Sequence, residues 1–98
     1  MKNELIPTII QDIKTLEVYM LGYSNEESLQ KTRTTGNVWF YSRSRRKLWM
    51  KGEESGNILK VKQVYFDCDK DTVLMKVMLQ GRVVCHTGNK SCFFYKLK

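Results

Sequence analysis

The chain has 98 residues, of which 42% are hydrophobic, which is enough for one compact domain and too few for two. Its 17 Lys and Arg residues against 10 Asp and Glu give a formal net charge of +7, which favours anionic partners such as nucleic acid, a membrane surface or a phosphorylated small molecule. No window approaches the roughly 20 consecutive apolar residues of a membrane-spanning helix, and the first residues do not form a secretory signal. We therefore expect one cytoplasmic domain over residues 1–98.

Most of the chain has the composition of short strands. Runs rich in β-branched and aromatic residues are separated by turn-like segments, which is typical of β structure. These runs are residues 8–12, 17–23, 37–42, 47–51, 58–66, 72–80, 82–86 and 92–97.

One segment, between the second and third of these runs, has the features of a helix. Ser24 is followed three residues later by Glu27, which is the spacing of a capping box, and Gly36 suits the left-handed residue that ends a helix. We predict a helix at about Glu26 to Thr34. One helix among short strands predicts a mainly β fold (α+β by content), either a curled antiparallel sheet or a small barrel-like structure capped by the helix.

Residues 38–52, "VWFYSRSRRKLWMKG", combine aromatic side chains with a group of basic ones between them. Rings and guanidinium groups in this arrangement can stack bases and bind phosphates of a single-stranded nucleic acid, or can hold one nucleotide. The alternative is a hairpin whose aromatic residues face the core and whose arginines are only solvated.

Three aspartates alternate in "DCDKD", at positions 67, 69 and 71. In an extended chain this alternation places three carboxylates on one side and Cys68 on the other. Like charges so close repel each other unless a cation lies among them, and oxygen ligands suit Mg²⁺. The alternative is a solvated, Asp-rich turn between strands.

The three cysteines and the only histidine are the other candidate site residues. Three cysteines in a reducing compartment do not suggest a disulfide framework. Three thiolates from Cys68, Cys85 and Cys92 would leave one position of a zinc ion open, as catalytic zinc requires, and His86 would transfer protons nearby. The alternative is that the cysteines are small buried residues and that His86 is structural.

Taken together, "LIPTIIQD", "TGNVWFYSRSRRKLWMKGEESGN", "DCDKD" and "CHTGNKSCF" resemble the phosphoribosyl-AMP cyclohydrolase family. The likeness runs in order from about Leu5 to Tyr95. No single motif carries it, because only their combination at these spacings is specific.

The resemblance implies a zinc hydrolase of histidine biosynthesis that opens the adenine ring of 1-(5-phosphoribosyl)-AMP at its N1–C6 bond. Zinc-bound hydroxide would attack C6, and His86 would transfer protons to or from the reacting atoms. The resemblance also implies a β pseudobarrel with a capping helix, working as an obligate homodimer, and Mg²⁺ as a second cofactor. The implied zinc ligands are Cys68 of one subunit with Cys85 and Cys92 of the other, and the implied magnesium ligands are Asp67, Asp69 and Asp71.

The implied substrate is a small molecule with two phosphorylated riboses, which gives the basic segment a use. Serine hydroxyls and arginine forks would bind its phosphates and a tryptophan would line its base pocket. The residues expected to do so are Trp39, Ser42, Arg43, Ser44, Arg45, Arg46 and Trp49.

The sequence departs from the family pattern in two places. Leu16 stands where relatives often have Gly in a turn. Arg82, Val83 and Val84 replace the residues that usually precede "CHTG" in the family. The chain ends soon after the last motif, so we expect it to catalyse one step only. We also expect its partner to be the small-molecule substrate, with no binding of nucleic acid or membranes. The main alternative function is a zinc-stabilised domain that binds RNA or another single strand, with structural cysteines.

Overall fold

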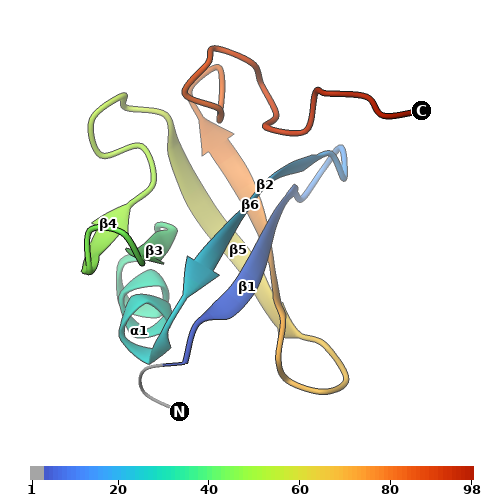
Figure 1. The fold of residues 1–98 in the computed structure, drawn as a ribbon. Helices are drawn as coiled ribbons and strands as arrows, with labels where there is room; N and C mark the ends of the chain where they lie inside the picture. Colours follow the sequence, from blue (N-terminus) through green and yellow to red (C-terminus); the bar gives the residue numbers. More distant parts are fainter. Residues whose placement is uncertain (1–3) are drawn as a thin grey trace.

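The structure, a computed structural model, describes residues 4–98 and contains a four-stranded sheet, a two-stranded hairpin and one helix (Figure 1). In chain order the elements are β1 (Ile6–Asp12), β2 (Val18–Ser24), α1 (Glu26–Thr35), β3 (Trp39–Ser42), β4 (Lys47–Met50), β5 (Ile58–Phe66) and β6 (Val73–Gln80).

The four-stranded sheet has the order β2-β1-β6-β5. β1 pairs antiparallel with β2 and parallel with β6, and β6 pairs antiparallel with β5. The core follows from the two-residue period of the strands: Val73, Met75 and Val77 of β6 are fully buried, and Ile10 of β1 packs with them. Burial of each such side chain contributes about 1.5–3 kcal/mol of hydrophobic free energy.

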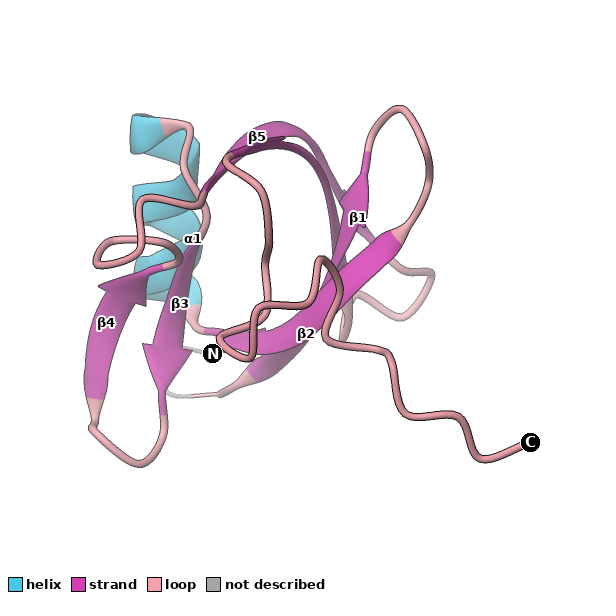
Figure 2. Ribbon diagram, turned by 90° about the horizontal axis from the view of Figure 1, so that it is seen from above, coloured by secondary structure: helices cyan, strands magenta, loops and turns pink. Residues whose placement is uncertain are grey.

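The sheet is strongly curled, and α1 and the β3–β4 hairpin lie at its open side (Figure 2). An isolated bridge joins Asn37 to Lys60 of β5, and the Val38 N–H donates to the Leu59 carbonyl at 3.0 Å. The edge strands β2 and β5 are not paired with each other. The fold is therefore mainly β with one helix, as predicted, but the sheet is not closed into a barrel.

The helix has a different N-cap from the one predicted. The Asn25 side chain accepts from the Ser28 N–H at 2.8 Å, and the Ser28 hydroxyl accepts from the Asn25 N–H at 2.9 Å, which completes the capping box. Ser24 is instead the last residue of β2, where its hydroxyl lies 2.7 Å from that of Thr8. The predicted end is confirmed, because Gly36 has a φ of 77°.

Six of the eight predicted strands are present, with small shifts at their ends, and the last two are wrong. Residues 81–98 form turns and an extended segment with no strand. The backbone of "VVCH" is used within its own loop, since Val84 N–H donates to the Lys90 carbonyl and Cys85 N–H to the Asn89 carbonyl, both at 3.1 Å. The one helix of residues 4–98 is not long and apolar enough to cross a membrane.

Candidate functional site

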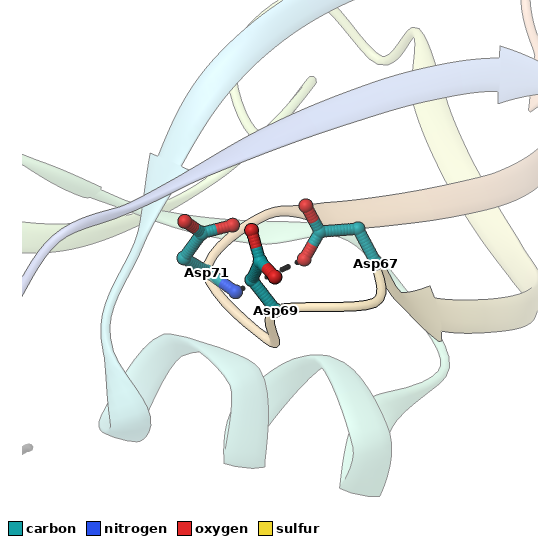
Figure 3. Close-up of side chains that lie close together, drawn as sticks. All are labelled: Asp67, Asp69 and Asp71. Carbon is teal, nitrogen blue, oxygen red and sulfur yellow. Dashed lines mark hydrogen bonds between the residues drawn. The ribbon is translucent and has the colours of Figure 1, made fainter.

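The turn between β5 and β6 gathers three carboxylates (Figure 3). Asp67, Asp69 and Asp71 each offer an oxygen within 4.8 Å of the other two, and all three side chains are exposed. The convergence was predicted, but its cause differs from the prediction. A tight turn, in which Lys70 has a φ of 60°, brings the carboxylates together, whereas the prediction relied on alternation along an extended strand.

Hydrogen bonds fix the first of these aspartates. The Oδ1 atom of Asp67 accepts hydrogen bonds from the Asp71 N–H at 3.0 Å and from the Thr72 N–H at 3.3 Å. Desolvation acts to raise the pKa of the Asp67 carboxyl, but these hydrogen bonds outweigh it, so that its pKa lies below the ordinary value. Charged oxygens held in this way are suited to a hard cation such as Mg²⁺.

Cys85 and Cys92 are brought together by a compact loop after β6. The Cys92 N–H donates to the Tyr19 carbonyl of β2 at 2.7 Å, and the Ser91 hydroxyl donates to the Val18 carbonyl at 2.7 Å. These bonds attach the loop to the start of β2. Cys85 is buried and Cys92 is half-buried.

The two thiols lie close enough for each to change the pKa of the other. The Thr87 hydroxyl donates to Cys85 Sγ at 3.0 Å and is the main cause that lowers the pKa of that thiol. Burial, followed by the neighbouring Cys85, raises the pKa of Cys92. Two adjacent thiols can supply two of the thiolate ligands that zinc takes in proteins.

One neighbour of these thiols was not predicted. The ammonium of Lys51, just after β4, lowers the pKa of both cysteines and therefore lies near them. The spacing of residues 51, 85 and 92 in the sequence does not predict this proximity, because it depends on how the hairpin packs against the rest of the chain. His86, next to Cys85, is exposed.

Cys68 does not join the other two cysteines within one chain. It is exposed in the β5–β6 turn, whereas Cys85 and Cys92 lie beyond the other end of β6 (Figure 1). A strand of eight residues such as β6 spans about 26 Å. The three predicted zinc ligands are thus split into a single thiol and a pair.

The tip of the β3–β4 hairpin collects most of the predicted substrate-binding residues. Two neighbouring hollows of about 330 and 270 Å³ are lined by residues that include Ser42, Arg43, Ser44, Arg45 and Trp49. The Arg43 guanidinium lies 4.6 Å from the centre of the Tyr23 ring, and Trp49 packs on Phe40 with 5.3 Å between ring centres. Both the larger hollow and the thiol loop are therefore adjacent to β2.

Two predicted substrate residues do not line these hollows. Trp39 packs toward the helix, with the Lys31 ammonium 4.7 Å from its ring centre and its backbone N–H donating to the Thr32 hydroxyl at 2.9 Å. Arg46 is exposed at the hairpin turn with a φ of 54°.

Comparison with known proteins gives a consistent result. A sequence model of the family described as phosphoribosyl-AMP cyclohydrolase matches residues 20–94. A protein of that name from Listeria innocua is 58% identical over 94 residues, which are 96% of this chain and 89% of the relative. Proteins of the same name from Clostridium botulinum and Geotalea uraniireducens are 56% and 54% identical, over 97% and 94% of this chain and 86% and 74% of their own lengths.

Proposed function

The chain belongs to the phosphoribosyl-AMP cyclohydrolase family of hydrolases in histidine biosynthesis, and we propose that it opens the adenine ring of 1-(5-phosphoribosyl)-AMP. Water adds at C6, the N1–C6 bond breaks, and the leaving nitrogen takes up a proton. The observation that carries the proposal is the thiol pair of Cys85 and Cys92 attached to β2, the strand that also lines the hollow of the basic hairpin.

Zinc is held, in this proposal, by Cys85 and Cys92 of one copy and by Cys68 of a second copy. The donor set fits, because thiolates are preferred zinc ligands and three of them leave a position for water. A zinc ion held in this way supplies a Lewis acid that lowers the pKa of water to near neutrality. The separation of Cys68 from the thiol pair by the length of β6 supports a homodimer, since one chain cannot supply all three ligands to one ion.

His86 transfers the proton during ring opening. It follows Cys85 directly and is exposed, so its imidazole can exchange protons with both the reacting atoms and solvent. Histidine is the side chain that most often acts as a general acid or base in enzymes, which suits it to this role.

The hairpin tip binds one phosphorylated ribose of the substrate. Hydroxyls of Ser42 and Ser44 and the guanidinium groups of Arg43 and Arg45 supply donors for phosphate, and Trp49 offers a ring for the base. Trp39 packs against Lys31 of the helix and away from these hollows, which favours a structural role for that residue.

Asp67, Asp69 and Asp71 hold Mg²⁺ through carboxylate oxygens, and the cation offsets the repulsion among them. The protein works in the cytoplasm on a small nucleotide and does not act on nucleic acid or membranes.

The test is the ultraviolet spectral change of phosphoribosyl-AMP on ring opening, followed with the purified protein before and after treatment with a chelator. We expect turnover that is lost with the chelator and restored by zinc, about one zinc per chain, and Cys92→Ser protein that lacks both zinc and activity. Absence of turnover in the zinc-loaded protein, with steeply salt-dependent binding of single-stranded RNA, would support the RNA-binding alternative instead.

A further inference from the structure

A separate hollow of about 410 Å³ lies where β1 and β6 end and the loop of the thiol pair begins. Three basic side chains from three different segments line it. Lys14 comes from the turn after β1, Arg82 from the segment after β6, and Lys90 from the thiol loop. None of them is among the substrate contacts proposed above.

One carboxylate, that of Asp12, also lines this hollow, but its oxygens already accept hydrogen bonds from neighbouring groups. Asp12 Oδ1 accepts from the Lys14 and Thr15 N–H groups at 2.8 and 2.9 Å, and Asp12 Oδ2 accepts from the Tyr19 hydroxyl at 2.6 Å. Glu17 pairs with Lys90 at 3.6 Å.

Two of the three cations form no ion pair. No carboxylate of residues 4–98 lies within 4.0 Å of the Lys14 ammonium or the Arg82 guanidinium. Three cations and one carboxylate line the hollow, so its net charge is positive and it attracts an anion.

The backbone places Arg82 at this position. Its N–H donates to Asn57 Oδ1 at 3.1 Å, across 25 residues of sequence. Gly81 before it has a φ of 141°, and a Cβ there would overlap the same Asn57 side chain, so only glycine permits this turn. A guanidinium on a fixed backbone presents a planar fork that matches the oxygens of a phosphate.

The hollow also adjoins the proposed reaction centre. Tyr19 lines it, and the Tyr19 carbonyl accepts from the Cys92 N–H, while Lys90 is two residues before Cys92. An anion bound here would lie close to the thiol pair and away from the tip of the β3–β4 hairpin, which lines different hollows.

We propose that this hollow is a second phosphomonoester subsite, in which Arg82 and Lys14, with Lys90 at the rim, bind the 5′-phosphate of one ribose of the substrate. The assignment rests on the proposed function, because a substrate with two such phosphates needs two anion sites. The hairpin tip holds one of them and this hollow holds the other.

The first measurement does not depend on turnover. Ribose 5-phosphate is titrated into isotopically labelled protein, and we expect the backbone amide signals of Lys14, Arg82 and Lys90 to shift with saturation. Arg82→Gln should abolish those shifts and leave any shifts at residues 42–45 unchanged. Shifts confined to the hairpin in the wild-type protein would overturn the subsite.

The second measurement is steady-state kinetics with phosphoribosyl-AMP. Arg82→Gln and Lys14→Gln should each raise KM about tenfold, as loss of a hydrogen bond to a charged group does, and change kcat less than about twofold. Lys98→Gln removes the same charge from the end of the chain and should leave KM unchanged.

An equal rise in KM for Lys98→Gln would assign the effect to net charge and overturn the subsite. Unchanged KM in both pocket variants would overturn it while leaving the proposed function intact. Failure of the wild-type protein to open the ring would contradict the proposed function itself, whereas the ribose 5-phosphate shifts would still decide the subsite.

Discussion

The neighbouring thiols Cys85 and Cys92 differ in how readily they lose a proton, and single side chains cause the difference. Thr87 donates a hydrogen bond to Cys85 and lowers its pKa, whereas burial raises the pKa of Cys92. Ligation of a metal requires both thiols to ionise, so metal binding by this loop releases protons and weakens as pH falls.

Replacement of the exposed histidine tests proton transfer at the same loop. His86→Ala should keep its zinc content and lower kcat by about a hundredfold, the lower range for loss of a general acid or base. A variant with unchanged kcat would remove His86 from the mechanism.

Asp12 makes stability depend on pH in the acid range. The hydrogen bond from the Tyr19 hydroxyl, followed by the Thr15 N–H, lowers the pKa of Asp12 from 3.8 to about 2. A carboxyl with a lowered folded-state pKa stabilises the fold above its unfolded pKa, and this stability is lost as pH falls from about 4 toward 2. Urea unfolding of wild-type and Asp12→Asn protein should therefore differ most near pH 6 and converge near pH 2.

Tyr19→Phe is the matched control for this prediction. It removes the hydroxyl that donates to Asp12 but keeps the buried ring, so it should weaken the same acid dependence. If the free energies of unfolding of wild type and Asp12→Asn differed by the same amount at pH 6 and pH 2, Asp12 would not be the source of the acid dependence.

Some features of the site could be predicted from the sequence and others could not. The three aspartates could be predicted to converge because they are close in sequence, although a turn and not a strand brings them together. The position of Lys51 near the thiols and the basic hollow at Lys14 and Arg82 could not be predicted, because both depend on long-range packing.

At the level of elements, the turn between β1 and β2 carries a strained residue. Leu16 has a φ of 66°, a left-handed conformation that costs a residue with a Cβ about 1–2 kcal/mol. A glycine at this turn would not carry that cost, so Leu16 keeps the turn in a strained conformation. The Leu16 side chain is 55% exposed and contributes little packing.

Leu16→Gly should raise the free energy of unfolding by about 0.5–1 kcal/mol, since relief of strain exceeds the greater entropy of glycine in the unfolded chain. Urea denaturation measures it. Leu16→Ala is the control, because it removes most of the side chain but keeps the Cβ, and it should give no comparable gain. A loss of stability in Leu16→Gly would show that the turn is not strained.

Elements with local signals were predicted well. Runs of β-branched residues and the helix-ending Gly36 act over a few residues, and the structure contains the corresponding strands and helix end. "RVVCH" and "CFFYKL" have the same composition, yet they form no strand. Composition does not reveal that the first of them bonds within its own loop and that Phe93 and Tyr95 stay exposed.

At the level of the whole molecule, the opposite positions of Cys68 and the thiol pair allow a complementation test. Cys68→Ser and Cys92→Ser chains should each be inactive. If each zinc site takes Cys68 from one copy and the pair from the other, a mixed dimer of the two variants contains one intact site. Random co-assembly then restores about a quarter of wild-type activity and zinc content, since half of the dimers are mixed and each has one of two sites.

No recovery in a co-purified mixture of the two variants, whose mass in solution is that of a dimer, would contradict the shared site. A mixture of Cys85→Ser with Cys92→Ser is the matched control. Both substitutions then fall on the same half of the site, so every dimer lacks a ligand in each site and no activity should return.

The outer half of β5 exposes apolar side chains at an edge of the sheet. β5 is an edge strand, and Val64, Tyr65 and Phe66 at its end are each more than 40% exposed. Unprotected apolar edges invite pairing with the wrong neighbour, which is the first step of aggregation. The chain is thus prone to pair wrongly with other copies through this edge, and overproduction at low temperature, which slows aggregation, should favour recovery of intact protein.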